Sequence, residues 1–182
     1  MAAMLDAAAA EFAYAGFDAA TMTAIAERSG SSIGALYQYF PNKLALARAL
    51  REQYGEDMAQ RWSGLIADAA QLSVTALVDR VFDLMIGFLD EHPAYFTLLN
   101  VTLGYQRNAD SRLRLRAQFG AALRQKKPEM GEDEALRIAN VALQIVKGLN
   151  PLYAQASAAE RRELVAEFKL ALAAYLKNRL HR

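Results

Sequence analysis

Apolar residues recur at spacings of three and four positions along almost the entire chain of 182 residues, which is the period of amphipathic α-helices. Strict alternation of apolar and polar residues, typical of a half-buried β-strand, is not sustained in any segment. Proline, which interrupts helices, stands at only four positions. The pattern therefore predicts an all-α protein of about nine helices.

The helix boundaries follow from the same period together with capping residues. Thr21 and Asn42 are good N-caps, Ser31 or Ser32 can cap a helix between them, and Gly16 suits a left-handed C-terminal cap. Three short helices are predicted first and six more follow, at 4–14, 22–28, 33–40, 43–69, 74–91, 93–105, 111–126, 133–150 and 158–179.

Two of the predicted short helices, 22–28 and 33–40, are joined by a tight turn at Gly30. Pro41 ends the second of them, and a longer helix starts directly afterwards. This is the layout of a helix-turn-helix, in which the second helix lies in the major groove of DNA.

The residues of this segment, TMTAIAERSGSSIGALYQYFPNKLAL at 21–46, combine an Ile-Ala pair, a glycine turn, a Leu-Tyr-x-x-Phe helix and a following lysine. The preceding helix carries LDAA at 5–8 and Phe12, with Gly-Phe at 16–17. In residue type, spacing and turn chemistry, the first fifty or so residues resemble the N-terminal signature of the tetracycline-repressor (TetR) family. The remaining chain matches that family only in its helix pattern.

The resemblance implies an organisation and a function. Residues 1–50 would form a three-helix, helix-turn-helix DNA-binding domain, and residues 51–182 a helical domain for ligand binding and dimerisation. Such a chain would be a ligand-responsive transcriptional regulator without a cofactor. Its simplest form is a repressor that binds a palindromic operator in double-stranded DNA as a homodimer and is released by a small, mainly apolar effector.

The matched residues have separable physical roles. Ile25, Ala26, Leu36 and Phe40 would form the small core that fixes the two short helices. Hydroxyl groups and cations suit the phosphate oxygens of DNA. The second helix of the motif, 33–40, is the recognition or reading helix, and small apolar groups and an amide on it can contact base edges. The expected phosphate contacts are Thr23, Arg28, Ser32, Tyr37, Tyr39 and Lys43, and the expected base contacts are Ile33, Gly34, Ala35 and Gln38. Any one of them alone could be an ordinary core or surface residue, so the indication of DNA binding comes from the combination.

The second domain offers two further sets of candidates. Aromatic and large apolar residues could line a ligand cavity or simply pack as core, namely Trp62, Phe82, Met85, Phe88, Tyr95, Phe96, Leu99, Tyr105 and Phe119. In the family, the last two helices pair with those of a second copy as a four-helix bundle. The stripes suited to that role, which could instead face the core of one chain, include Leu136, Leu143, Val146, Leu164, Phe168, Leu172 and Tyr175.

The distribution of charged residues along the chain does not favour the simplest form of this hypothesis, in which the DNA-binding domain is basic. The net charge is +1, but residues 1–50 hold three bases and four acids, whereas residues 105–127 hold seven bases and one acid. Few cations lie near the predicted reading helix, so we expect modest DNA affinity and a shallow salt dependence. The basic run at 107–127 is interpreted as a solvated helix face or, alternatively, as a surface for an anionic ligand or acidic partner.

Composition excludes several other classes. The chain has no cysteine, so disulfides and thiolate chemistry are absent and a cytoplasmic location is expected. It has two histidines, no glycine-rich phosphate loop and no strand that could carry a nucleophile, so neither catalytic nor metal-binding residues are predicted. No uninterrupted run of about 20 apolar residues could cross a membrane. The remaining alternative is a helical adaptor of the same fold without specific DNA binding, which the acidic first domain favours.

Overall fold

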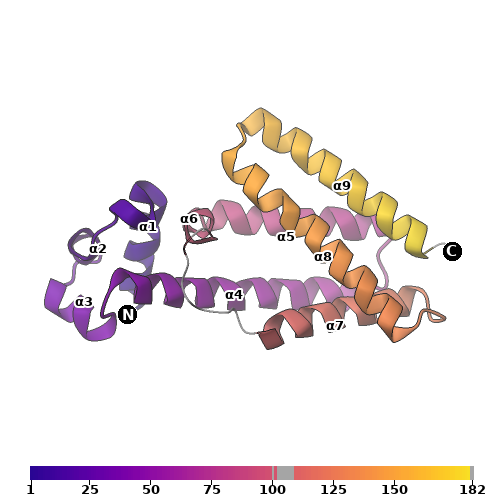
Figure 1. Cartoon of the computed structure of the whole chain (residues 1–182), viewed down its shortest axis with the longest axis horizontal. Coiled ribbons are helices and arrows are strands. Elements are labelled where there is room, and N and C mark those ends of the chain that lie inside the picture. Colours follow the sequence, from indigo (N-terminus) through magenta and orange to yellow (C-terminus); the bar gives the residue numbers. More distant parts are fainter. Residues whose placement is uncertain (100, 102–108, 181–182) are drawn as a thin grey trace. The chain divides into compact units, whose positions relative to one another are not determined.

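The computed structural model describes residues 1–99, 101 and 109–180, and these residues form helices joined by turns, without a β-strand. Nine helices are present in this part of the chain, which confirms the all-α prediction (Figure 1). The described residues fall into two compact units. Unit 1 is drawn from 1–58 and 88–107, and unit 2 from 59–87 and 108–182.

Unit 1 contains three N-terminal helices, α1 (Ala2–Ala19), α2 (Met22–Arg28) and α3 (Ile33–Tyr39), and the short α6 (Ala94–Leu99). The first part of α4 (Lys43–Asp68) and the last residues of α5 (Val74–Glu91) also belong to it. Helix α1 packs against α2 and α6. Its buried face includes Ala8 and Phe12, which are completely inaccessible to solvent.

Helix α1 consists of two helical segments that meet at Gly16, whose backbone angles (φ +80°, ψ 165°) are not helical. The first segment ends there, as the sequence predicts, and a short second segment, which the sequence does not predict, continues to Ala19. Gly16 has φ +80°, a left-handed backbone angle that glycine adopts without steric penalty. Gly16 therefore ends the first segment, as predicted.

Unit 2 contains the rest of α4 and α5 together with α7 (Ala109–Lys126), α8 (Glu132–Gln155) and α9 (Ala158–Leu180). Helices α8 and α9 pack against each other as a helical hairpin, and α7 packs against α8 (Figure 1). At Gly148 an added Cβ would stand 3.3 Å from the Phe168 ring, so α8 and α9 approach closely there because residue 148 has no side chain. Leu172 and Leu176 of α9 are buried.

The end of α8 differs from the boundary that the sequence predicts. The sequence predicts its end at Asn150 because Pro151 follows, yet the helix runs through Pro151 to Gln155. The extra turn is held by tertiary contacts: Tyr153 is buried, its carbonyl accepts a hydrogen bond from Arg161 Nε at 3.0 Å, and the Arg161 guanidinium lies 4.7 Å from its ring centre. These contacts offset the hydrogen bond that a proline cannot donate. The predicted helix 93–105 is likewise shorter where it is described, since α6 ends at Leu99 and Val101 lies in a bend.

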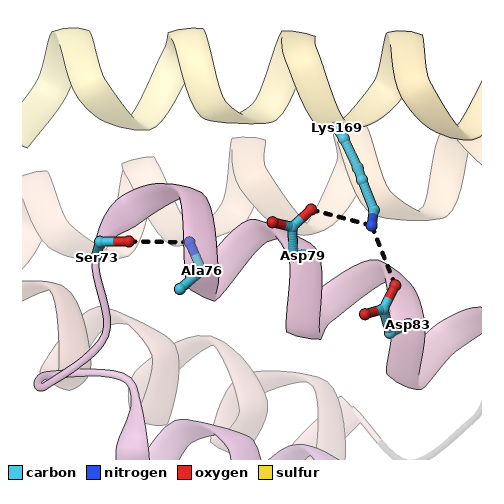
Figure 2. A network of polar contacts seen from close by, with 5 residues as sticks. All are labelled: Ser73, Ala76, Asp79, Asp83 and Lys169. Carbon is cyan, nitrogen blue, oxygen red and sulfur yellow. Dashed lines mark hydrogen bonds and ion pairs between the residues drawn. The ribbon is translucent and has the colours of Figure 1, made fainter.

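Polar contacts fix the helices of unit 2 to one another. Ser73 caps α5 by accepting a hydrogen bond from the Ala76 amide, and Lys169 of α9 forms ion pairs with Asp79 and Asp83 of α5 at 3.0 and 3.1 Å (Figure 2). Burial acts to lower the pKa of Lys169, but the hydrogen bonds and charges of the two aspartates outweigh it and the pKa is raised.

The basic run also contributes a structural contact. Lys126 donates hydrogen bonds to the carbonyls of Ala70 and Leu72, and burial lowers its pKa. This lysine is therefore bound within unit 2, and a description of the whole run as a solvated face does not hold for it.

Candidate nucleic-acid interface

The turn between α2 and α3 is built by local hydrogen bonds that the sequence encodes. Thr21 Oγ1 accepts from the Ala24 amide at 3.1 Å and begins α2, and Ser32 Oγ accepts from the Ala35 amide at 3.1 Å and begins α3. Between them Gly30 has φ +66°, which lets the Ser31 amide turn back to the Ala26 carbonyl at 3.0 Å. The helix-turn-helix predicted at 22–40 is present.

The inward faces of the two helices form a small apolar core. Ile25 and Leu36 are fully buried, Ala26 is 2% exposed and Phe40 is 7% exposed. The sequence predicts that these four side chains form the core of the two helices, and their burial confirms that they are core residues. Because this core is small, the backbone hydrogen bonds at the turn also help to fix the geometry of the motif.

The outward face of α3 presents large side chains to solvent. Ile33 is 41% exposed, Tyr37 is 50% exposed and Tyr39 is 58% exposed, and Gly34 and Gln38 are exposed between them. Ala35 is half-buried, and Thr23 of α2 is exposed. The structure therefore brings the predicted base-contacting and hydroxyl-bearing residues onto accessible positions of a single short motif.

Two of the predicted cations have partners inside unit 1. Arg28 forms an ion pair at 3.2 Å with Glu11, whose side chain is almost buried. Lys43 Nζ donates to the carbonyls of Phe17, Asp18 and Ala20 at 2.8, 2.7 and 3.2 Å, and it lies 4.9 Å from the centre of the Phe17 ring. Lys43 thus neutralises the C-terminal carbonyls of α1, where a cation is favoured by the helix dipole. No local pattern indicates this role, because it depends on contacts between residues 23 to 26 positions apart.

The predicted pocket residues do not share one unit. Trp62, Phe82, Met85 and Phe119 are buried residues of unit 2. The other described members belong to unit 1: Phe88 is fully buried with Tyr95 edge-on at 5.2 Å, Phe96 is half-buried and Leu99 is 38% exposed. Tyr105 lies outside the described residues. Their role in ligand binding stays a prediction.

A cleft of about 370 Å³ lies in unit 1 at residues that the sequence pattern does not single out. Its walls come from α1, α4 and the turn between α5 and α6, and they include Asp6, Leu50, Tyr54, Glu91, His92 and Pro93. No local motif could have identified these positions, because the cleft arises only when three separate segments pack together.

The predicted dimer residues differ in how they lie within unit 2. Leu143, Val146 and Leu172 are between 1% and 4% exposed, so they pack within the chain and have little area left for a second copy. Leu136, Leu164, Phe168 and Tyr175 are half-buried. The most exposed large apolar residues of α8 and α9 lie elsewhere on these helices: Val141 is 43%, Leu152 is 47% and Leu170 is 64% exposed.

Three buried polar atoms in the described part of unit 2 also have no counterpart in the sequence pattern. Asn150 Oδ1, Arg116 Nε and Arg179 Nε are inaccessible to solvent and have no hydrogen-bond partner. Buried polar groups are usually paired, so an unpaired one needs a specific reason. In the described part of the chain, no helix is long and apolar enough to cross a membrane, and no cluster of three or more histidine or acidic side chains is placed to hold a metal ion.

Comparison with known proteins gives two family matches that together span most of the chain. Residues 4–50 match the family model for bacterial regulatory proteins of the tetR family. Residues 73–176 match the model for the tetracyclin repressor-like C-terminal domain. Among curated proteins, the nucleoid occlusion factor SlmA of Marinomonas sp. is 25% identical over 150 residues, which are 82% of this chain and 75% of that protein.

Solved structures show the same fold over nearly the whole chain. A TetR-family transcriptional regulator from Streptomyces coelicolor has a TM-score of 0.67 at 24% identity and covers 98% of both chains. The regulator FadR from Bacillus subtilis, solved with stearoyl-CoA, has a TM-score of 0.64 at 17% identity and covers 96% of both chains.

Proposed function

Because the chain belongs to the tetracycline-repressor family of bacterial transcriptional regulators, we propose that it represses transcription as a homodimer on a palindromic operator. A small, mainly apolar effector bound by the C-terminal domain releases it from DNA. Residues 1–50 are the DNA-binding domain in this proposal, and residues 51–182 bind the effector and the second copy. The protein acts in the cytoplasm, where its DNA lies.

The observation that carries the proposal is the outward face of α3. Two exposed tyrosines and an exposed isoleucine lie on a helix of seven residues in which Leu36 is the one buried side chain. In the major groove, Gln38 can bond adenine, while Ile33 and Ala35 can contact thymine methyl groups. Thr23, Ser32, Tyr37 and Tyr39 supply hydroxyl groups for phosphate oxygens, and the backbone at Gly34 permits close approach.

Electrostatic attraction contributes less to this interface than in a strongly basic protein. Arg28 and Lys43 are at its edge, but both have partners within unit 1. If each protomer neutralised two phosphates, the slope of log K against log salt concentration would be about −3.6 for the dimer. We therefore assign sequence discrimination chiefly to hydrogen bonds and apolar contacts of α3.

The proposed dimer surface is the exposed side of the α8–α9 hairpin. Val141, Ile145 and Leu152 follow one another at spacings of four and seven, so they share one face of α8. Leu170 supplies an exposed apolar side chain on α9. This face takes the place of the more buried positions expected from the sequence. A two-fold pair would position two reading helices for half-sites about 34–36 Å apart.

The effector is proposed to bind in unit 2, where Trp62, Phe82, Met85 and Phe119 supply buried apolar surface. A polar group on the effector would satisfy Asn150 Oδ1, which is the buried acceptor among the atoms of unit 2 left without a partner. The FadR structure supports the proposal to the extent that a protein of similar fold was solved with stearoyl-CoA. Effector and operator would favour different arrangements of the dimer, so each weakens binding of the other.

The test is fluorescence anisotropy with DNA from beside the protein's own coding region, against a scrambled duplex at two salt concentrations. Tyr37→Ala removes an exposed side chain of the reading helix, and Tyr14→Ala is the matched control because Tyr14 is 85% exposed on α1. We expect specific binding that Tyr37→Ala weakens about tenfold or more and Tyr14→Ala leaves unchanged. Equal binding to both duplexes would instead favour the adaptor function, which the partnered Arg28 and Lys43 support.

The dimer is tested separately by sedimentation. Leu170→Glu places a charge on the proposed contact face, whereas Leu113→Glu places one on α7, where Leu113 is 55% exposed. The first variant should sediment as a monomer and the second as a dimer. If both behave alike, the α8–α9 face is not the interface.

A further inference from the structure

The cleft in unit 1 has features of a ligand site distinct from the proposed effector site in unit 2. One wall is the small-residue face of α1, with Ala9, Ala10 and Ala13. The rest of the lining includes Leu50 and Tyr54 of α4 and the segment around Pro93. Small side chains on one wall leave room, and the volume of about 370 Å³ is within the range of sites that hold small molecules.

Tyr54 is the key residue of this cleft. It is only 4% exposed, and its ring packs against Phe88, His92 and Tyr95. Among the described residues its hydroxyl has no hydrogen-bond partner, although the side chain lines the cleft. Burial raises the pKa of Tyr54 to about 12, with a further contribution from the negative charge of Asp6. The neutral phenol thus lies near a carboxylate without a hydrogen bond between them.

The charge of the lining is one-sided. Asp6 and Glu91 bring carboxylates to the cleft, and neither lysine nor arginine lines it. Asp6 forms no ion pair with any described residue. His92 also lines the cleft, but its Nε2 already donates a hydrogen bond to Asp57 Oδ2 at 3.0 Å.

We propose that this cleft binds a small organic cation of the alkylammonium class, with Asp6 and the Tyr54 hydroxyl accepting hydrogen bonds from its ammonium group. The alanine face of α1, Leu50 and Pro93 cover the apolar part of the ligand. A carboxylate and a neutral phenol oxygen are both acceptors, so together they favour an ammonium group over an uncharged hydroxyl group and repel a carboxylate. Binding at this site needs neither DNA nor the effector of unit 2.

The experiment uses the full chain and three probes of nearly equal size: butylammonium, 1-butanol and butyrate. Backbone amide chemical shifts are followed by NMR during titration at pH 7 and low salt. We expect butylammonium to shift amides of α1 and of the residues near Tyr54, with an affinity about tenfold higher than that of butanol, and butyrate not to bind there.

Three variants locate the site. Asp6→Asn keeps the shape and removes the charge, so we expect affinity for butylammonium to fall about three- to tenfold. Tyr54→Phe keeps the buried ring and removes the hydroxyl, with a smaller loss. Asp18→Asn is the matched control, because Asp18 is an exposed acid on α1 that does not line the cleft, and it should leave affinity unchanged.

The proposal is overturned if butylammonium and butanol bind equally, if no probe shifts amides near the cleft, or if Asp6→Asn and Asp18→Asn behave alike. DNA binding is measured on the same variants as an independent quantity. A chain that binds butylammonium but no operator contradicts only the proposed function, and the reverse result contradicts only the cation site.

Discussion

Replacing Lys43 separates a structural role from a DNA-contacting one. In Lys43→Met the side chain keeps its length and apolar stem but loses the ammonium group that bonds three carbonyls at the end of α1. A cation at a helix C-terminus contributes about 0.3–1 kcal/mol at an exposed site and up to about 2 when partly buried. The contact with the Phe17 ring adds roughly 0.5–1 kcal/mol.

These contributions overlap and Lys43 is only half-buried, so we expect Lys43→Met to destabilise the protein by about 1–2 kcal/mol, less than their sum. For a chain of this length, that corresponds to a Tm lower by roughly 2–8 °C. The matched control is Lys177→Met, which removes the charge of an exposed lysine on α9 and should change stability by less than about 0.5 kcal/mol. Both are measured by thermal and urea unfolding.

The DNA measurement completes the test. If Lys43 acts only within unit 1, Lys43→Met leaves the salt dependence of operator binding unchanged. If it instead contacts phosphate, as the sequence predicts, the slope should become less steep by about 2 for the dimer while stability stays constant. An unchanged Tm combined with that change in slope would refute the structural role of Lys43 at the end of α1.

Three further outcomes are expected. Gly30→Ala places a side chain at a left-handed backbone angle and should lower the free energy of unfolding by about 1–2 kcal/mol. Gly34→Ala, at a helical position with open space, should not destabilise the protein. Urea unfolding compares the two variants. Lys169→Met should lower stability by about 0.5–1 kcal/mol at pH 7. Because the pKa of Lys169 is raised, this difference should disappear as the pH rises past its folded value, above 10.5, and a difference independent of pH would contradict the ion-pair assignment. Glu160 has its pKa lowered by hydrogen bonds from the backbone and side chain of Ser157, so its contribution is present above the ordinary value of 4.5 and is lost as the pH falls through its folded value. Glu160→Gln should therefore differ from the parent chain in urea midpoint at pH 7 but not in acid, and equal midpoints at pH 7 would count against this contact.

Local chemistry explains why so much of the helix-turn-helix could be predicted. Thr21, Ser32 and Asn42 cap helices through bonds to amides three residues away, and these bonds form as the sequence indicates. Gly30 takes the left-handed angle that the turn requires. Each of these interactions spans at most a few residues, so sequence spacing alone specifies its geometry.

Tertiary contacts decided the rest. Pro151 remains helical because Tyr153 is anchored by Arg161, a contact that no local rule contains. The stripe of α8 is apolar as predicted, but which of its residues face the chain's own core depends on where α7 and α9 pack against it. Val141 and Val146 have the same chemistry and opposite exposure.

The sequence by itself determined the helical class, the helix-turn-helix and the residues exposed on its second helix, because short-range periodicity and capping encode them. Only the tertiary structure showed that Lys43 bonds to the end of α1 and that Tyr54 and Asp6 line one cleft. Those arrangements join residues separated by 23 positions or more in the sequence. Because the hydrophobic effect is non-directional, the pattern of apolar residues along the chain does not specify which distant side chains come into contact.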